Sequence, residues 1–217
     1  SCIYPKYAEQ PIRENSILSG PLEPTNEPYA LAKIAGIKLC ETYFKQYGDN
    51  FISLMPTNLY GPRDNFHPKT SHVIPALIQK FHKAKTNSEK YVEIWGSGNP
   101  LREFLHVDDL SEGAIHIMNL SKKSFDKNTS SLQSHINIGY GVDVKISDLA
   151  VEISRIVNYK GKIEFDISKP DGPKQKLLDV SRLKSLGWES KIELENGLKI
   201  TYEQYKKELK DNSIRSK

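Results

Sequence analysis

The chain has 217 residues, of which 37% are hydrophobic and 27% charged, and its net charge is +4 at pH 7. No apolar run approaches the roughly 18 residues of a membrane span, and no signal-peptide pattern is visible. Cys2 and Cys40 are too few and too isolated for a disulfide framework or a zinc site, which favours a reducing cytoplasm. Because basic and acidic residues are interspersed outside the tail, we expect neither a nucleic-acid nor a membrane partner, whereas an anionic ligand is compatible.

The first predicted element is the end of a buried strand at residues 1–4. No cap or turn precedes it, so the chain reads as the continuation of a longer protein, and we expect an N-terminally truncated fragment. Residues 5–28 are rich in proline and polar side chains and predict a surface loop. A helix is predicted from Tyr29 to Tyr47, ended by Gly48, which is a favourable C-cap.

The apolar residues of this helix do not form a single stripe. Leu31, Ile34, Leu39 and Tyr43 are spread most of the way round it, which predicts burial on two sides. A sheet on one side and a second subunit on the other would account for that. We therefore expect a homodimer in which the helix that carries Tyr29 and Lys33 forms the interface.

Strands and helices alternate along the rest of the chain. Short apolar runs predict buried strands and longer periodic runs predict helices, so the sequence indicates an α/β fold with a mostly parallel sheet. Polar residues predict a surface loop at 121–134 and a flexible tail at 210–217. The predicted strands are 51–55, 91–95, 104–107, 135–138 and 162–167, and the predicted helices are 72–83, 108–120, 147–158, 181–187 and 194–209.

One part of a dinucleotide-binding fold is not found in the sequence. Such a fold carries a Gly-x-Gly-x-x-Gly turn after its first strand. Gly96-x-Gly98 and Gly139-x-Gly141 both lack the third glycine. We therefore predict the second half of a Rossmann-type doubly wound parallel sheet at residues 1–59 and 103–142, with an interleaved smaller α/β substrate-binding domain at residues 60–102 and 143–209.

Tyr29 and Lys33 form the candidate chemical centre. Their spacing of four places the phenol and the ammonium on one helical face. A cation one turn away favours the phenolate, which suits proton transfer to and from alcohols and ketones. On its own this spacing is more often a surface aromatic beside a solvated lysine.

Several motifs in order resemble the extended short-chain dehydrogenase/reductase family: 1–5 (SCIYP), 28–33 (PYALAK), 56–62 (PTNLYGP) and 102–109 (REFLHVDD). Four further phrases resemble the members that act on a GDP-linked 4-keto-6-deoxy sugar: 23–29 (EPTNEPY), 64–68 (DNFHP), 71–75 (SHVIP) and 169–172 (KPDG). The resemblance runs from Ser1 to about Leu209. It implies NADPH-dependent epimerisation at C3 and C5 and reduction at C4 of GDP-4-keto-6-deoxy-D-mannose.

The resemblance also implies the roles of individual residues. Tyr29 would donate the proton to the C4 oxygen, and Lys33 would lower the pKa of that tyrosine and hold the nicotinamide ribose. Cys2 and His72 would form the acid/base pair that epimerises C3 and C5, because protons next to a ketone must be removed and returned. The implied contacts to NADPH or NADP are Ser1, Lys33, Pro56, Thr57, Asn58, Leu59 and His72, and those to the GDP-sugar are Lys80, Trp95, Arg102, Asp171 and Lys176.

Some features depart from the family pattern and leave alternatives open. The catalytic serine of the family would precede Ser1, and the glycine-rich turn is missing, so we expect this chain to bind NADPH poorly and not to turn over. Exposed sheet edges predict poor solubility. One alternative is another nucleotide-sugar epimerase or dehydratase, although a 4-epimerase has no use for Cys2 and His72. The other is a non-catalytic remnant that binds a nucleotide sugar or a partner.

Overall fold

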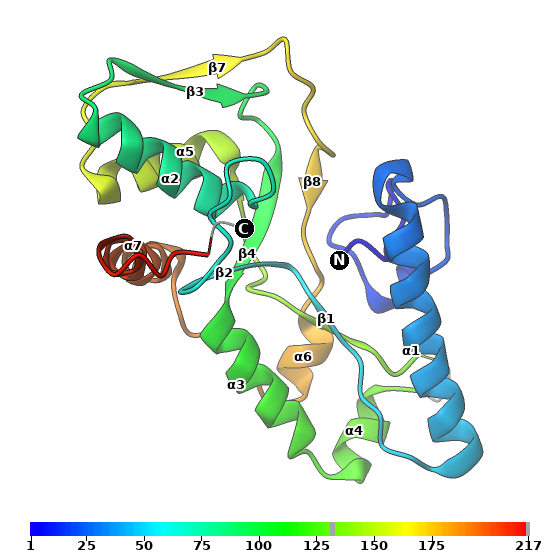
Figure 1. Ribbon diagram of the computed structural model, residues 1–217. Helices are drawn as coiled ribbons and strands as arrows, with labels where there is room; N and C mark the ends of the chain where they lie inside the picture. Colours follow the sequence, from blue (N-terminus) through cyan, green and yellow to red (C-terminus); the bar gives the residue numbers. More distant parts are fainter. Residues whose placement is uncertain (131–132, 216–217) are drawn as a thin grey trace. The chain divides into compact units, whose positions relative to one another are not determined.

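The computed structural model describes residues 1–130 and 133–215 and divides into two compact units (Figure 1). The first unit comprises Ser1–Asn58, Asp109–Asp143 and Lys176–Lys191. The second comprises Leu59–Asp108, Val144–Gln175 and Ile192 onward. The sequence also predicted a boundary near residue 59, and it assigned two segments to the other part of the chain. Residues 103–108 continue a strand of the second unit, and residues 176–191 pack in the first.

The first unit is built on two short parallel strands and four helices. Strand β1 (Leu54–Pro56) pairs with β5 (Ile136–Ile138), so that Leu54 lies opposite Ile136 and Pro56 opposite Ile138. The parallel pairing agrees with the predicted α/β class, and a bridge from Ile12 to Leu178 joins the early loop to the segment before the last helix of this unit. The helices are α1 (Glu27–Tyr47), α3 (Val107–Met118, in this unit from Asp109), α4 (Lys122–Asn128) and α6 (Ser181–Ser185).

Helix α1 buries one stripe of side chains. Ala30, Ile34, Ile37 and Glu41 follow the spacing of one helical face and are all buried, whereas the large apolar residues Leu31, Leu39, Tyr43 and Tyr47 are exposed. The predicted burial on two sides is therefore seen on one side only within this chain. As predicted, Gly48 ends the helix: its φ of 78° is left-handed, and its N–H donates to the Phe44 carbonyl at 3.0 Å.

Two local predictions for the first unit are wrong. Residues 1–4 form a turn rather than a strand end, although Ile3 and Tyr4 are buried as expected. Residues 121–134 contain helix α4, because the Ser121 hydroxyl caps it by accepting the Ser124 N–H and because Phe125 is buried. Because the segment is otherwise mostly polar, nothing in the sequence indicated that Phe125 would be buried. Residues 131 and 132 of the predicted loop lie outside the described residues.

The second unit packs three helices against two small sheets. Strands β3 (Tyr91–Trp95) and β7 (Lys162–Asp166) are parallel, with Tyr91 opposite Lys162 and Trp95 opposite Asp166. Strands β2 (Asn58–Tyr60), β4 (Leu101–His106) and β6 (Asp143–Lys145) pair in that order. Figure 1 shows α2 (Val73–Thr86) and α5 (Ile146–Val157) side by side near β3 and β7. The last helix is α7 (Leu194–Lys210), and β8 (Gln175–Lys176) lies at the division of the units.

Alternating burial along β3 fixes which side chains face the solvent. Val92 and Ile94 join the buried core of α2, α5 and α7, whereas Tyr91, Glu93 and Trp95 point outward. The tail predicted to be flexible from residue 210 is hydrogen-bonded further along, because the Phe66 N–H donates to the Arg215 carbonyl at 2.9 Å. Residues 216 and 217 lie outside the described residues.

Gly113 in α3 allows close packing in the first unit. A Cβ there would lie 2.6 Å from Ile138 Cδ1 and 3.2 Å from the Trp188 ring. We expect Gly113→Ala to lower the free energy of unfolding by about 1–3 kcal/mol through overpacking. The matched control is Gly36→Ala in α1, where nothing lies within 4 Å. There we expect a gain of about 0.5–1 kcal/mol from helix propensity. Urea unfolding measures both, and equal effects of the two substitutions would contradict the prediction.

A buried polar network lies beneath β5 in the first unit. Tyr4, Glu14, Glu41, His135 and Asn137 are each at most 5% exposed. The Glu41 carboxylate accepts the Ser134 N–H at 3.1 Å and the Lys38 ammonium at 2.7 Å. Burial, followed by the nearby charges of Arg182 and Lys38, lowers the pKa of His135 to about 4. His135 is therefore neutral, even though Glu41 lies 4.0 Å from its Nδ1.

The pKa of His135 predicts acid destabilisation. In the unfolded chain this imidazole takes up a proton near its ordinary pKa of 6.5, whereas the folded chain resists protonation down to about pH 4. The contribution of neutral His135 is thus complete above pH 6.5 and is lost as the pH falls toward 4. Between about pH 6.5 and pH 5 we expect a loss of roughly 2 kcal/mol from this residue. Urea unfolding of the wild type and His135→Gln at both pH values measures it, and the same pH dependence in both proteins would refute it.

Candidate active site

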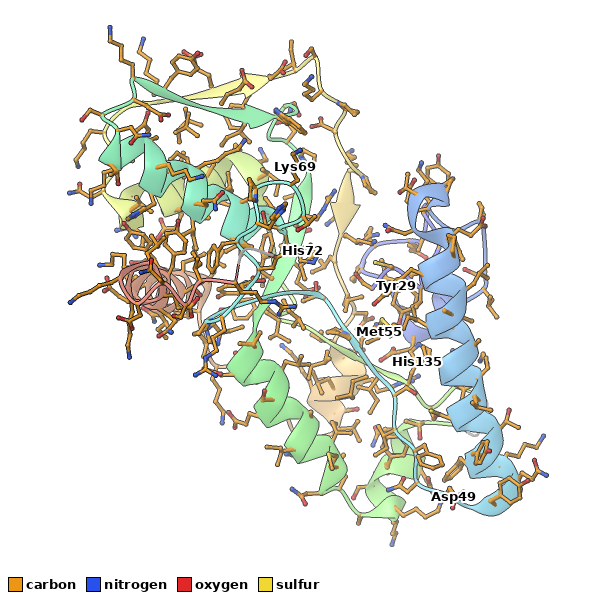
Figure 2. All side chains as sticks on the ribbon, in the orientation of Figure 1. Tyr29, Asp49, Met55, Lys69, His72 and His135 are labelled. Atoms are coloured by element: carbon orange, nitrogen blue, oxygen red, sulfur yellow. The ribbon has the colours of Figure 1, made fainter. Side chains whose placement is uncertain are left out.

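Tyr29 and Lys33 lie one turn apart near the start of α1. The neighbouring Ala30 and Ile34 belong to the buried stripe, whereas Tyr29 is 58% exposed and projects from the helix (Figure 2). Lys33 Nζ lies 5.4 Å from the centroid of the Tyr29 ring. An ammonium at that distance is attracted by the ring. A phenol and an ammonium therefore share an accessible face of the helix.

The carboxyl end of β1 gathers further predicted residues. The Ser1 nitrogen donates to the Pro56 carbonyl at 2.9 Å, and the Thr57 N–H donates to the Ile138 carbonyl at 3.1 Å. Cys2 follows Ser1 as a free, half-buried thiol. Because open α/β sheets bind ligands outside the carboxyl ends of their strands, this is a suitable place for a thiol that meets a ligand.

His72 occupies the N-cap position of α2 in the second unit (Figure 2). Its side chain is exposed, and its carbonyl accepts the Ala76 N–H at 3.0 Å. In the loop before it, Asp64 Oδ2 is buried and has no hydrogen-bond partner within residues 1–130 and 133–215. Burial raises the pKa of Asp64, whereas the Asn65 N–H and the charges of His72 and Arg215 lower it. An accessible imidazole thus begins α2, close enough to Asp64 to affect its ionisation.

Trp95 stands at the end of β3 between two lysines. Its indole is 67% exposed, and Lys80 Nζ and Lys169 Nζ lie 5.9 and 5.6 Å from the ring. Lys80 also donates to the Glu93 carbonyl at 3.0 Å, which holds its side chain against β3. Lys169 was not predicted as a site residue, although it begins the KPDG phrase that was singled out. Two cations beside an exposed aromatic suit a ligand that joins phosphates to a ring.

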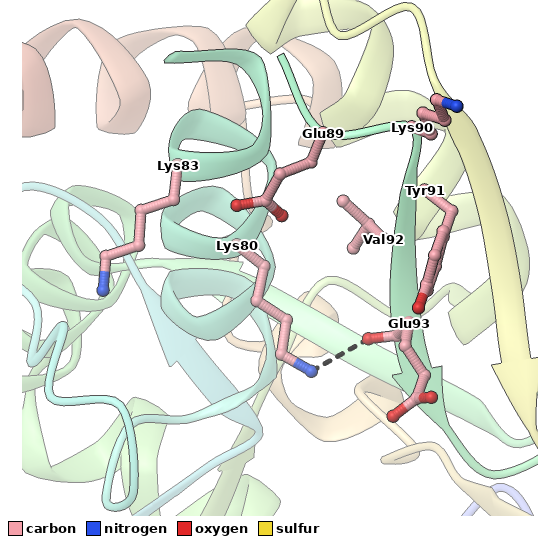
Figure 3. Close-up of a pocket in the computed structure, with 7 residues that line it drawn as sticks. All are labelled: Lys80, Lys83, Glu89, Lys90, Tyr91, Val92 and Glu93. Carbon is pink, nitrogen blue, oxygen red and sulfur yellow. Dashed lines mark hydrogen bonds between the residues drawn. The ribbon is translucent and has the colours of Figure 1, made fainter. Parts of the chain in front are cut away.

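A groove of about 670 Å³ adjoins Lys80 along the edge of β3 (Figure 3). Its lysines provide positive charge, and Tyr91 provides an aromatic face. Of the residues that line this groove, only Lys80 was predicted as a site residue. No motif in the sequence pointed to the other lining residues. The residues that line it are Lys80, Lys83, Glu89, Lys90, Tyr91, Val92 and Glu93.

Asp171 closes the turn that follows β3. Its carboxylate accepts the Ser97 N–H at 2.8 Å and the Ser97 hydroxyl at 2.6 Å. These hydrogen bonds lower the pKa of Asp171, and Arg102 lowers it further. Burial lowers the pKa of Arg102, which the charge of Asp171 opposes. Gly96 makes the turn possible, because its φ of 86° is left-handed and a Cβ would collide with the Asp171 carboxylate. Ser97 is thus a partner that the sequence analysis missed.

The predicted site residues fall into both units. Lys176 belongs to the first unit, apart in the chain's division from the other predicted GDP-sugar contacts. The first unit holds Ser1, Cys2, Tyr29, Lys33, Pro56, Thr57, Asn58 and Lys176, and the second holds Leu59, His72, Lys80, Trp95, Arg102 and Asp171.

Within the described ranges, no three or more histidine, cysteine, aspartate or glutamate side chains are placed to hold a metal ion. In the same ranges, no helix combines the length and the apolar character that spanning a membrane requires.

The fold and these groups define a class of protein. Residues 1–139 match the NAD dependent epimerase/dehydratase family, and the chain belongs to it. Over 203 residues the chain is 59% identical to the GDP-L-fucose synthase of Escherichia coli K12, covering 94% of this chain and 63% of that enzyme. The chain thus spans less than two thirds of that relative's length.

Solved structures give the same fold. A GDP-6-OMe-4-keto-L-xylo-heptose reductase from Campylobacter jejuni superposes with a TM-score of 0.89 and 40% identity, covering 95% of this chain and 68% of that one. A GDP-L-fucose synthetase from Naegleria fowleri bound to NADP gives a TM-score of 0.87 and 28% identity, covering 99% of this chain and 66% of that one. By name, the first protein acts on a GDP-linked sugar, and the second carries NADP. Both agree with what the sequence resemblance implied.

Proposed function

We propose that the chain carries the catalytic and substrate-binding part of a GDP-L-fucose synthase. This enzyme would epimerise C3 and C5 of GDP-4-keto-6-deoxy-D-mannose and reduce C4 with NADPH, giving GDP-L-fucose. The observation that carries the proposal is the exposed Tyr29 phenol with Lys33 Nζ 5.4 Å from its ring centroid. The identity of 59% to the E. coli enzyme supports the substrate.

Reduction needs a proton for the C4 oxygen, and Tyr29 would donate it. Lys33 would hold its ammonium beside the phenol and bind the nicotinamide ribose. NADPH supplies the hydride when bound, and the residues present fit its nicotinamide end: an exposed ammonium on α1, and Pro56, Thr57 and Asn58 at the carboxyl end of β1. Ser1, Leu59 and His72 are the other residues that we assign to cofactor contacts.

Epimerisation needs a base and an acid for the carbons next to the ketone. We assign these roles to Cys2 and His72, because a thiol and an imidazole both exchange protons near neutral pH. The half-buried free thiol of Cys2 and the exposed imidazole of His72 are compatible with those roles.

The GDP-sugar would bind largely through the second unit. Lys80 and Arg102 supply positive charge for the diphosphate, and Lys80 binds it as a point charge without the bidentate geometry of arginine. Trp95 offers an exposed aromatic face, and Asp171 offers a carboxylate held by Ser97. Lys176 completes the set of proposed contacts.

We further propose a cytoplasmic homodimer that uses α1. The exposed apolar residues Leu31, Leu39 and Tyr43 lie off the buried stripe of this helix, and a second subunit would cover them. The cytoplasm agrees with the free thiols of Cys2 and Cys40.

Two other functions remain as alternatives. The first is a different nucleotide-sugar enzyme of the family, such as a reductase without epimerisation; the similarity to the C. jejuni GDP-heptose reductase favours it. The second is a non-catalytic remnant that binds a nucleotide sugar or a partner.

One assay separates these functions. The purified chain, and the same chain extended upstream in its reading frame, are mixed with NADPH and GDP-4-keto-6-deoxy-D-mannose, and loss of NADPH absorbance is followed. We expect oxidation with the extended protein and a GDP-L-fucose product. Oxidation without inversion at C3 and C5 would favour a reductase. If neither protein oxidises NADPH, the result would favour the non-catalytic remnant.

A further inference from the structure

The turn that carries Cys2 is fastened on both sides. On one side, the Ser1 nitrogen donates to the Pro56 carbonyl of β1. On the other side, the Tyr4 hydroxyl donates to Asn137 Oδ1 of β5 and lies 3.1 Å from His135 Nε2. Tyr4 is 2% exposed and Asn137 is fully buried. The residues on either side of Cys2 are thus hydrogen-bonded to β1 and β5, two neighbouring parallel strands.

The hydrogen bonds of this network have one consistent direction. Asn137 Nδ2 donates to the carbonyls of Ile12 at 2.9 Å and Asp179 at 3.2 Å, so the amide oxygen faces Tyr4 and can only accept. Burial raises the pKa of Tyr4, which keeps the phenol protonated as the donor. His135 must then donate through Nε2 to the phenol oxygen. The Tyr4 hydroxyl therefore has one defined orientation.

Asn137 also fixes the segments around the turn. Its N–H donates to Glu14 Oε1 at 3.1 Å, and Glu14 in turn lies 3.7 Å from Arg182 Nε. Arg182 donates to the His135 carbonyl at 3.0 Å. The early loop, β5 and α6 are thereby joined by the side-chain amide and the backbone N–H of Asn137 together with Arg182, so the position of Tyr4 is set by several elements at once.

A polar network at this place needs a reason beyond burial. Phenylalanine at position 4 would fill nearly the same volume, and buried polar groups stabilise a fold only modestly even when they are paired. The hydroxyl instead ties the turn at residues 1–4 to Asn137 of β5. We propose that Tyr4, through Asn137, is a positioning residue that sets the place of the Cys2 thiol.

This inference rests on the proposed function for the role of the thiol. A base that removes a proton from carbon must be held within hydrogen-bond reach of it, and a displacement of about 1 Å costs roughly 100-fold in rate. The proposed contacts to the GDP-sugar are mostly in the second unit, so a loosened Cys2 turn should lower kcat and leave KM nearly unchanged.

The first test needs no catalysis. Tyr4→Phe is labelled with iodoacetamide, and the labelling rates of Cys2 and Cys40 are compared by peptide mass spectrometry. Cys40, also a half-buried free thiol of the first unit, is the internal control. We expect the Cys2:Cys40 ratio to rise at least about threefold, because a released turn exposes the thiol to the reagent. The matched control is Tyr202→Phe, which removes a Tyr–His contact of 3.0 Å to His82 in the second unit and should leave the ratio unchanged.

The second readout follows solvent deuterium entering C3 and C5 of the keto sugar in the upstream-extended protein. For Tyr4→Phe we expect kcat for this exchange to fall by roughly 10- to 100-fold with KM within about twofold. An unchanged labelling ratio with unchanged exchange would overturn the inference, as would equal acceleration of both cysteines. Should Tyr4→Phe fail to fold, Asn137→Ser removes the same acceptor and is expected to act in the same direction. A shifted labelling ratio with no exchange in the wild type would refute the proposed function and leave the anchoring of Cys2 standing.

Discussion

Tyr29→Phe is expected to reduce NADPH oxidation by the upstream-extended protein by roughly 100- to 10,000-fold, the usual contribution of a positioned proton donor. The substitution removes the hydroxyl that would protonate the C4 oxygen. It retains the aromatic ring, so the contact of Lys33 with that ring, at 5.4 Å, remains possible. Because Tyr29 is 58% exposed, loss of its hydroxyl should change stability little. The rate of absorbance loss at saturating GDP-4-keto-6-deoxy-D-mannose measures the effect on kcat.

Tyr43→Phe provides the matched control for this substitution. Tyr43 is another exposed tyrosine of α1, and its ring lies 5.4 Å from that of Tyr47, away from the predicted chemistry. We expect its kcat to stay within about twofold of the wild type, because the Tyr43 hydroxyl has no part in the proposed proton transfer. Equal losses in the two variants would mean that the phenol of Tyr29 is not the proton donor.

Cys2→Ala is expected to abolish exchange of the C3 and C5 protons, with a loss of at least about 100-fold, because the carbon acids would lose a base. Reduction of a substrate that is already epimerised should continue, since Tyr29 and Lys33 are intact. Mass spectrometry of the sugar after incubation in D₂O measures the exchange.

Cys40→Ala controls for the loss of a thiol. Cys40 is a free, half-buried cysteine of α1, and it has no proposed role. Its exchange rate should match that of the wild type. If Cys2→Ala retains full exchange, then Cys2 is not the base that removes the C3 and C5 protons.

Helices and strands with a regular hydrophobic period and clear terminating residues could be predicted from the sequence. Helix α1 was predicted to end at Gly48 because only a residue that tolerates a left-handed φ suits that position. Strand β3 and helix α5 follow from simple periodicity. Helix α4 could not be found in this way, because its stability depends on Phe125 being buried against distant residues and on the cap at Ser121.

The sequence suggests candidate site residues but does not reveal their hydrogen-bond partners. Spacing predicted Tyr29 and Lys33, and the family resemblance implied Asp171. Ser97 could be recognised as the partner of Asp171 only in the structure, where the turn brings these distant residues together. The same holds for Tyr4 and Asn137, which are joined across 133 positions of the chain. Hydrogen bonds of such range leave no periodic signal in a sequence.

The two tryptophans lie in different units and in opposite environments. Trp95, in the second unit, is 67% exposed between two lysines, whereas Trp188, in the first unit, is 5% exposed. Intrinsic fluorescence therefore contains two separate reporters. Iodide should quench the emission of Trp95 and spare that of Trp188, and a nucleotide diphosphate should protect Trp95 from the quencher. The burial of Trp188 leaves its emission to report the unfolding of the first unit, so ligand binding and stability can be followed in one cuvette without a label.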